Sequence, residues 1–285
     1  MTLIDGKSIS AKVKEEIKSV ASNLAAKGVE PALAVILVGE DAASKTYVAS
    51  KEKACAACGI RSVAHRLSSD VSETALLELI ENLNEDESID GILVQLPLPK
   101  HIDTNKILEK ISPQKDVDGF SAINVGKLTS GLSDGFVPCT PLGVMRLLEE
   151  YSVQIAGKNA VVLGRSNIVG KPMANLLLNA DATVTIAHSK TKNLKQLCTD
   201  ADILVAAVGR THFVGADMVK QGAVVIDVGI NRGEDGKLRG DVDFDAVAPK
   251  CSLITPVPGG VGPMTIAMLL SNTIKSAKNR LRQRV

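Results

Sequence analysis

The feature that most constrains the fold is a regular alternation of short, fully apolar runs with amphipathic stretches along the 285-residue chain. An apolar run without polar alternation is typical of a strand buried on both faces, as in a parallel sheet covered by helices. We expect such strands at 31–38, 90–96, 159–163, 203–208 and 224–228, and further strands that include polar residues at 61–66 and 183–187. The pattern therefore predicts an α/β protein with parallel sheets.

Helical periodicity fills most of the intervals between these strands. We expect helices at 9–27, 42–58, 72–84, 141–151, 171–179, 193–200 and 217–221, with a final helix at 265–283. The stretch 97–139 is instead rich in Pro, Gly and Asp and is expected to consist mainly of loops. A long irregular segment inside a compact protein is usually functional.

Composition argues against several classes of function. Aromatic residues make up only 2% of the chain, whereas nucleic-acid binders of the base-stacking kind need aromatic platforms. The formal net charge of +1 argues against a broad polyanion-binding face. No apolar run reaches the roughly 18 residues of a membrane span, and the N-terminus lacks a signal-peptide pattern. We therefore expect a cytoplasmic protein without nucleic-acid or membrane partners.

The five cysteines are an odd number, in a chain large enough to fold without disulfides. They are expected to be reduced thiols, as in a cytosolic protein. Cys55 and Cys58 form a C-x-x-C pair in an Ala-rich helix. Without a second pair or a nearby His, this pair does not predict a zinc site, and we expect no metal.

A glycine-bearing loop follows the expected strand at 159–163. The sequence runs from Gly164 through Arg165 and Ser166 to Gly170, and Pro172 suits the first turn of the next helix. Such a loop offers backbone N–H groups and a helix N-terminus to a pyrophosphate. It departs from the standard G-x-G-x-x-G pattern, so an ordinary strand-to-helix turn remains an alternative.

The next strand bears on the choice of cofactor. NAD-binding proteins place an Asp or Glu about 20 residues downstream, on the ribose hydroxyl. Here Ser189 follows Arg165 by 24 positions and no acid stands there, which favours NADP because an Arg and a hydroxyl bind a 2′-phosphate. A polar turn before the next helix is the alternative.

The order of the predicted strands and helices also indicates the domain organisation. We expect two lobes separated by a cleft: an α/β catalytic lobe (1–139, completed by 265–285) and a Rossmann-like NADP-binding lobe (140–264).

The catalytic lobe offers a candidate lysine and glutamine. Tyr47 and Lys51 are four residues apart and share one helix face of small, apolar surroundings. Desolvation would lower the pKa of Lys51 into a range useful for acid–base chemistry. Gln95 is the single polar residue in the run GILVQLPLP, and a buried amide needs a partner. The alternatives are a solvated surface lysine and an edge-strand glutamine that faces water.

Two further segments have the composition of ligand-binding loops. KDVDGF contains Asp116 and Asp118, either of which could simply stabilise a turn before Gly119, while a ligand-anchoring carboxylate is the sharper interpretation. TPVPGGVGPMT precedes the last helix, and its glycines would let backbone approach a ligand closely. The basic end of the chain (Lys275, Lys278, Arg280, Arg282 and Arg284) is expected to complement the C-terminus of that helix.

Taken together, these motifs resemble one family. YVASK, GILVQLPLP, KDVDGF, PCTP, GRSNIVGKP, HSKT, DVGIN and PVPGGVGPMT occur in the order found in bifunctional methylenetetrahydrofolate dehydrogenase/cyclohydrolases. The resemblance implies oxidation of 5,10-methylenetetrahydrofolate by NADP, then hydrolysis of the methenyl product to 10-formyltetrahydrofolate. It also implies one-carbon metabolism that serves purine, methionine and histidine synthesis, and homodimers formed through the cofactor domain.

The resemblance assigns roles to individual residues of this chain. It implies a catalytic lysine at Lys51, with Tyr47, Gln95 and the pterin-holding Asp118 beside it. The implied cofactor residues are Gly164, Arg165, Ser166, Ser189 and Ile230, of which the resemblance puts Ile230 beside the nicotinamide half. The implied substrate contacts are Tyr47, Lys51, Val94, Gln95, Leu96, Asp118, Pro256, Val257, Pro258, Gly259, Gly260, Val261, Gly262, Pro263 and Met264.

Two other functions remain open from the sequence. A two-lobe NADP dehydrogenase could act on a different small substrate, such as a shikimate-like acid, but it would not account for KDVDGF together with VQLPLP. A non-catalytic NADP-binding regulator could keep the fold without turnover, although the intact Tyr47, Lys51 and Gln95 weigh against it. An absorbance assay with methylenetetrahydrofolate and either cofactor separates the three.

Overall fold

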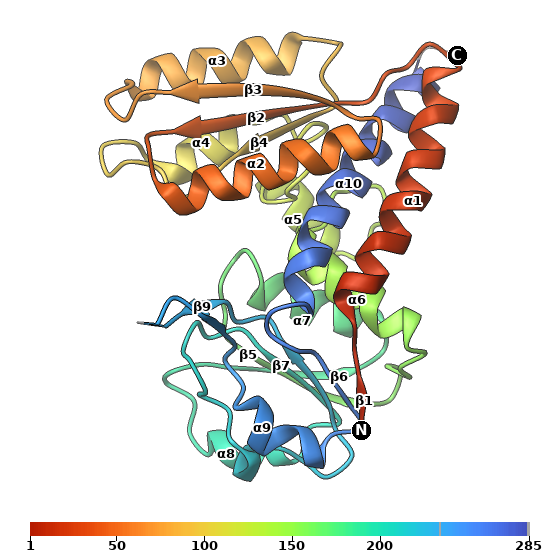
Figure 1. Cartoon of the computed structure of the whole chain (residues 1–285), viewed down its shortest axis with the longest axis vertical. Helices are drawn as coiled ribbons and strands as arrows, with labels where there is room; N and C mark the ends of the chain where they lie inside the picture. The colour runs from red at the N-terminus through yellow and green to blue at the C-terminus, as the bar shows by residue number, and fades with distance from the viewer. Residues whose placement is uncertain (234, 284–285) are drawn as a thin grey trace. The chain divides into compact units, whose positions relative to one another are not determined.

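The structure, a computed structural model, describes residues 1–233 and 235–283 (Figure 1). The chain forms two compact units, each built from discontinuous segments. Unit 1 contains Met1–Ala11 and Thr140–Thr265, and unit 2 contains Lys12–Cys139 and Ile266–Val285. The boundary falls inside the first helix, α1 (Gly6–Ala25), and inside the last, α10 (Val261–Gln283).

Unit 2 contains a three-stranded parallel sheet in the order β3-β2-β4. Its strands are β3 (Arg61–Leu67), β2 (Ala32–Val38) and β4 (Gly91–Val94), which confirms the three strands predicted here to within a few residues. β2 is buried along its whole length, because helices cover both faces of the sheet. Figure 1 shows α2 (Ala42–Ala57) and α3 (Glu73–Glu85) on opposite sides of the strands.

The region 97–139 is less irregular than the sequence indicated. It contains two short helices, α4 (Thr104–Lys110) and α5 (Ala122–Thr129), which the loop prediction missed. Both have a local cause, because Asp103 and Ser121 accept hydrogen bonds from backbone N–H groups of the first turns. The loops that remain include 95–103 and 111–120, the segments that contain Gln95 and Asp118.

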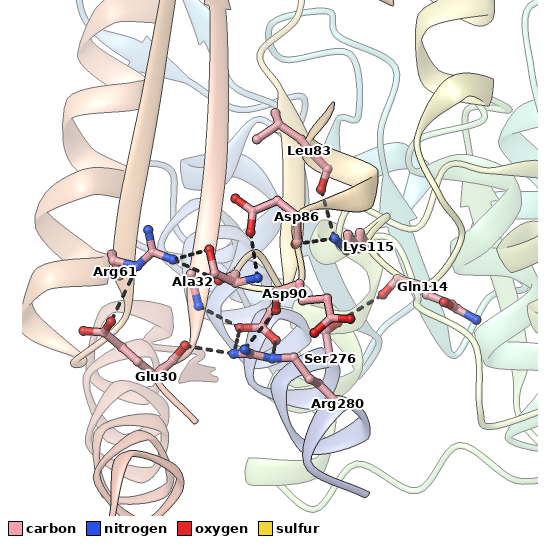
Figure 2. A network of polar contacts seen from close by, with 12 residues as sticks. Glu30, Ala32, Arg61, Leu83, Asp86, Asp90, Gln114, Lys115, Ser276 and Arg280 are labelled. Atoms are coloured by element: carbon pink, nitrogen blue, oxygen red, sulfur yellow. Dashed lines mark hydrogen bonds and ion pairs between the residues drawn. The ribbon is translucent and has the colours of Figure 1, made fainter. Parts of the chain in front are cut away.

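A buried ion pair fixes the end of α10 within unit 2 (Figure 2). The Arg280 guanidinium donates to both carboxylate oxygens of Asp90 (2.8 and 2.9 Å) and to the carbonyls of Glu30 and Glu87. Asp90 in turn accepts from the Ala32 N–H at the start of β2. The prediction that the basic end only complements a helix terminus is therefore wrong for Arg280. Arg284 lies outside the described residues.

Unit 1 is built on a six-stranded parallel sheet in the order β1-β11-β8-β7-β5-β6. Four of its strands were predicted: β5 (Asn159–Leu163), β6 (Thr183–Ala187), β7 (Ile203–Ala206) and β8 (Val224–Asp227). The other two, β1 (Thr2–Leu3) and β11 (Leu253–Ile254), were not, because two-residue strands are defined by pairing rather than by a local pattern.

The helices of unit 1 follow the predicted pattern with one exception. α6 (Cys139–Glu150), α7 (Gly170–Asn179) and α8 (Leu194–Thr199) lie where helices were expected, while the predicted helix at 217–221 is only a 3-10 turn at Ala216–Met218. Short elements complete the unit: α9 (Phe244–Val247), a 3-10 turn at Ala248–Lys250, and the hairpin of β9 (Asn231–Arg232) and β10 (Leu238–Arg239).

Two further observations concern the chain as a whole. Within 1–233 and 235–283, no helix is both long enough and apolar enough to cross a membrane. All five cysteines lie in that part of the chain, and each is a buried free thiol.

Candidate active site and cofactor site

Unit 2 pairs the predicted lysine with the predicted glutamine. Lys51 lies on α2 with only 8% of its surface exposed, and its Nζ donates to Oε1 of Gln95 at 2.9 Å. Gln95 directly follows β4, and its Nε2 donates to the Leu96 carbonyl, which orients the amide. The Tyr47 ring, half-exposed one turn earlier on α2, has its centroid 5.9 Å from Nζ. The alternative of a solvated lysine is therefore wrong. Gln95 is partly buried after the edge strand β4, and its amide is bonded to Lys51 and to backbone.

Asp118 belongs to the same cluster. Its carboxylate is partly buried and accepts from the Cys139 thiol at 3.5 Å. Asn272 of α10 donates to the carbonyls of Val117 (2.8 Å) and Val137 (3.0 Å), and so fixes the backbone on either side of this contact. Cys139 was predicted only as part of the PCTP motif. Asn272 was not predicted, because a single amide on a buried helix face gives the sequence no clear functional pattern.

Asp116 and Asp118 have different surroundings. Asp116 is buried, and its carboxylate accepts from the Phe120 and Ser121 N–H groups and from the Asn124 side chain. These bonds occupy both oxygens of Asp116 within its own loop. Asp118 makes no such turn bonds within the described chain, so its second oxygen is the one able to accept from a ligand.

Burial shifts the pKa values of the two ionisable groups Lys51 and Asp118 in opposite directions. Burial lowers the pKa of the Lys51 ammonium, and the nearby Asp118 carboxylate acts in the opposite direction. Burial raises the pKa of the Asp118 carboxyl to about 6, against the effect of Lys51. The lysine is therefore closer to its neutral, basic form than a solvated lysine at the same pH.

In unit 1, glycines stand at both ends of the strand-to-helix turn 164–170. Gly164 adopts φ +115°, and a Cβ there would collide with the Ala207 carbonyl oxygen. A Cβ on Gly170 would likewise collide with the Gly164 carbonyl. Ser166 Oγ accepts from the Val169 and Gly170 N–H groups and shapes the entry into α7. Glycines at both ends are thus required by close backbone packing at this strand-to-helix turn.

The other predicted cofactor residues lie in exposed loops of unit 1. Arg165, Ser166 and Ser189 are all exposed, and within 1–233 and 235–283 the Arg165 guanidinium has no hydrogen-bond or ion-pair partner. The turn that contains Ser189 is closed by the Thr191 hydroxyl, which accepts from the His188 N–H. Ile230 follows β8 with 48% of its surface exposed.

Only part of the predicted substrate loop 256–264 is a loop. Residues 256–260 are irregular, whereas 261–264 already form the first turn of α10, earlier than the predicted helix start. The first turn of α1 packs against this loop: Lys7 N–H donates to the Gly259 carbonyl, and Ser10 Oγ donates to the Pro263 carbonyl. Val94, by contrast, is the buried last residue of β4 in unit 2.

These features define a class of protein. Unit 1 contains a parallel sheet with a glycine-bearing turn, and unit 2 buries a lysine beside an amide and a carboxylate. This combination is typical of a nucleotide-dependent α/β enzyme. The model of the tetrahydrofolate dehydrogenase/cyclohydrolase catalytic domain matches residues 4–118, and that of the family's NAD(P)-binding domain matches 138–281. The chain belongs to this family, which confirms the resemblance seen in its motifs.

Individual relatives agree over nearly the full length. The bifunctional protein FolD of Campylobacter hominis is 72% identical over 283 residues, which are 99% of each chain. The crystal structure of the Campylobacter jejuni bifunctional enzyme FolD has a TM-score of 0.97 at 59% identity, covering 98% of this chain and 99% of that one. A Trypanosoma brucei enzyme, solved with NADP cofactor and inhibitor, has a TM-score of 0.94 at 42% identity, covering 99% and 98%.

Proposed function

We propose that this protein is a bifunctional enzyme of folate one-carbon metabolism. It oxidises 5,10-methylenetetrahydrofolate with NADP and then hydrolyses the resulting 5,10-methenyltetrahydrofolate to 10-formyltetrahydrofolate. The observation that carries the proposal is the buried Lys51 ammonium bonded to Gln95 Oε1 at 2.9 Å, with Asp118 beside it. The relatives that are 72% and 60% identical to this chain are named as bifunctional proteins of the same family.

The first step needs alignment rather than a catalytic base. Bound NADP supplies the acceptor for a hydride, which leaves the methylene carbon with its electron pair and produces the methenyl cation. We assign to Asp118 the task of holding the pterin ring by accepting its N–H groups, and to Tyr47 the task of packing against it. Holding the reacting carbon in one place is itself a large part of catalysis in such a step.

The second step needs a proton acceptor. Water attacks the methenyl carbon and loses one proton. The second proton leaves the resulting carbinol hydroxyl and is gained by N5 as the carbon–nitrogen bond at N5 breaks, which leaves the formyl group on N10. We assign the first proton to Lys51 in its neutral form, which desolvation favours. Gln95 orients the amine through the Nζ–Oε1 bond. One proton is released overall, so Lys51 is reset by losing it to solvent.

For unit 1 we propose an NADP site formed by Gly164, Arg165, Ser166, Ser189 and Ile230. The guanidinium of Arg165 and the hydroxyl of Ser189 are exposed and able to bind a 2′-phosphate. We also propose that residues 256–264, with Val94 and Leu96, contact the folate. As functional domains we propose 1–139 with 265–285 for catalysis and 140–264 for the cofactor, while the residues 1–11 fold with unit 1.

We further propose a homodimer formed through unit 1. β6 is the edge strand of the six-stranded sheet, and Ile186 on it and Leu178 on α7 are exposed apolar side chains. An uncovered strand edge with apolar neighbours is a natural surface for self-association. Light scattering on the wild type and on Leu178→Lys tests this: the variant should shift the mass from dimer to monomer. The buried free thiols support a reducing, cytoplasmic location.

A direct assay tests the function. Purified protein is mixed with 5,10-methylenetetrahydrofolate and NADP, and the absorbance of the methenyl product and of NADPH is followed. We expect NADPH to form and the methenyl signal to rise and then fall as hydrolysis proceeds. NADPH formation without loss of the methenyl signal would leave only the dehydrogenase, and no reaction with either NADP or NAD would contradict the proposal.

A further inference from the structure

Unit 1 contains a completely buried carboxylate that was not among the predicted site residues. Asp241 has no exposed surface, and its two oxygens accept four N–H groups. Three are backbone groups of the loop after β7: Val208 at 2.6 Å, Gly209 at 3.0 Å and Arg210 at 2.8 Å. The fourth is Nδ2 of Asn231 at 2.9 Å. This number of donors is what a buried charge requires, because an uncompensated one is costly.

A second buried aspartate is joined to the first. Asp227 ends β8, and its carboxylate accepts the N–H groups of Gly229, Asp241 and Val242, each at 2.9 Å. Burial nevertheless raises the pKa of this carboxyl to about 6. A Cβ on Gly229 would collide with the Asp241 carboxylate, and one on Gly240 would collide with that of Asp227. The backbone is therefore shaped to let both carboxylates in.

The two carboxylates hold the residues that precede and follow Ile230. Gly229, before it, is bonded to Asp227, and Asn231, after it, is bonded to Asp241, while Ile230 itself projects with 48% of its surface exposed. Asp241 ties the same segment to the loop after β7. Both loops follow the carboxyl ends of parallel strands, where ligands bind in open α/β sheets.

We propose that Asp241 is a positioning residue for the nicotinamide half of the bound cofactor. It sets the loops 208–210 and 229–231 in one geometry, and so determines where Ile230 meets the reactive ring. The inference rests on the proposed NADP-dependent function. Asp241 touches no substrate or cofactor itself, since its oxygens are all occupied by protein N–H groups.

The experiment compares Asp241→Asn with Asp245→Asn, which loses the same charge at an exposed position four residues on. Three quantities are measured: dehydrogenase kcat and KM for NADP, binding of adenosine 2′,5′-bisphosphate as the other half of the cofactor, and cofactor-free hydrolysis of methenyltetrahydrofolate. For Asp241→Asn we expect dehydrogenase kcat/KM to fall roughly ten- to hundredfold, the range for one lost charge-assisted hydrogen bond. The other two quantities should stay within twofold, and Asp245→Asn should match the wild type in all three.

Other outcomes overturn the inference. Unchanged dehydrogenase kinetics in Asp241→Asn would do so, and so would a parallel fall of all three quantities, which indicates a purely structural role. If Asp241→Asn does not fold, Asn231→Ala removes only the bond beside Ile230, and a dehydrogenase loss below about threefold would then contradict the proposal. A wild-type protein without either activity would instead refute the proposed function.

Discussion

The two units differ in how deeply they bury the polar side chains of their proposed sites. In unit 2 the groups proposed for chemistry are themselves sheltered: Lys51 is buried and bonded to Gln95, and the pKa of Asp118 is shifted to about 6. In unit 1 the groups proposed for recognition, Arg165 and Ser189, are exposed on loops. Unit 1 also has two buried carboxylates, those of Asp227 and Asp241, which bind backbone N–H groups and one side-chain amide.

The difference follows from what each site must do. A proton acceptor needs a displaced pKa, and the main way to lower that of a lysine is to remove water from it. A phosphate is itself charged and is bound by groups that keep their ordinary protonation, so these can stay in water. Substitutions in unit 2 should therefore change reaction rates, and substitutions at the exposed positions of unit 1 should change cofactor affinity.

The largest effect is expected at Lys51. Lys51→Met should lower the cyclohydrolase rate by about 10²–10⁴-fold, the usual contribution of a general acid–base group. Dehydrogenase activity should survive in part, because hydride transfer needs no enzyme base, and methenyltetrahydrofolate should accumulate and be visible by its absorbance. Lys51→Arg should not restore hydrolysis, since a guanidinium stays protonated. The exposed Lys53 on the same helix provides the control, Lys53→Met. Hydrolysis at the wild-type rate in Lys51→Met would refute the assignment.

The paired aspartates give the next test. Asp118→Ala should lower kcat/KM of both activities in parallel, roughly a hundredfold, because both reactions use the same bound ring and a charge-assisted bond contributes about 1.5–3 kcal/mol. Asp116→Asn should instead lower the free energy of unfolding by about 1–3 kcal/mol, since it leaves a buried N–H without an acceptor. Kinetics and thermal unfolding of both variants check this, and equal folate binding in the two would contradict the division of roles.

Much of the fold could be predicted from the sequence, because its strands are continuous apolar runs. β2 and β5 appear within one residue of the predicted limits. The elements missed are those that depend on distant partners. β1 is a two-residue strand whose only cause is pairing with β11, about 250 residues away, through Thr2 with Leu253 and Leu3 with Ile254. No local pattern can reveal such a strand.

The site was only partly predictable, for a similar reason. Helical spacing places Tyr47 and Lys51 on one face, but the bond from Lys51 to Gln95 spans 44 residues and required the folded sheet. Asp227 and Asp241 were overlooked as acids beside loops, although each lies next to a glycine-containing turn at a strand end. Their function depends on burial, and an aspartate in a sequence gives no measure of its own burial.

A smaller effect is expected in unit 1, where it concerns cofactor choice. Arg165→Ala should raise KM for NADP roughly ten- to hundredfold, the cost of one lost charge-assisted bond to a phosphate. KM for NAD should change little, because NAD lacks the 2′-phosphate, and NAD therefore serves as the internal control. Steady-state kinetics with both cofactors measure the ratio. Equal losses for NADP and NAD would show that Arg165 does not read the phosphate.

The smallest effect is expected in the pH profile of hydrolysis. It tests the side of the comparison that concerns unit 2, where burial shifts the pKa values of Lys51 and Asp118. The cofactor-free cyclohydrolase reaction needs neutral Lys51 and ionised Asp118. Burial raises the pKa of Asp118 to about 6, so below that pH the carboxylate gains a proton and log kcat/KM should fall more steeply than the lysine alone would cause. In Asp118→Asn the extra steepness should vanish. The remaining limb should also move to lower pH, because the Asp118 carboxylate is what raises the pKa of Lys51 against burial. Initial rates of both proteins between about pH 5 and 8 measure this. A limb that moves to higher pH in Asp118→Asn would show that Lys51 is not the group that titrates.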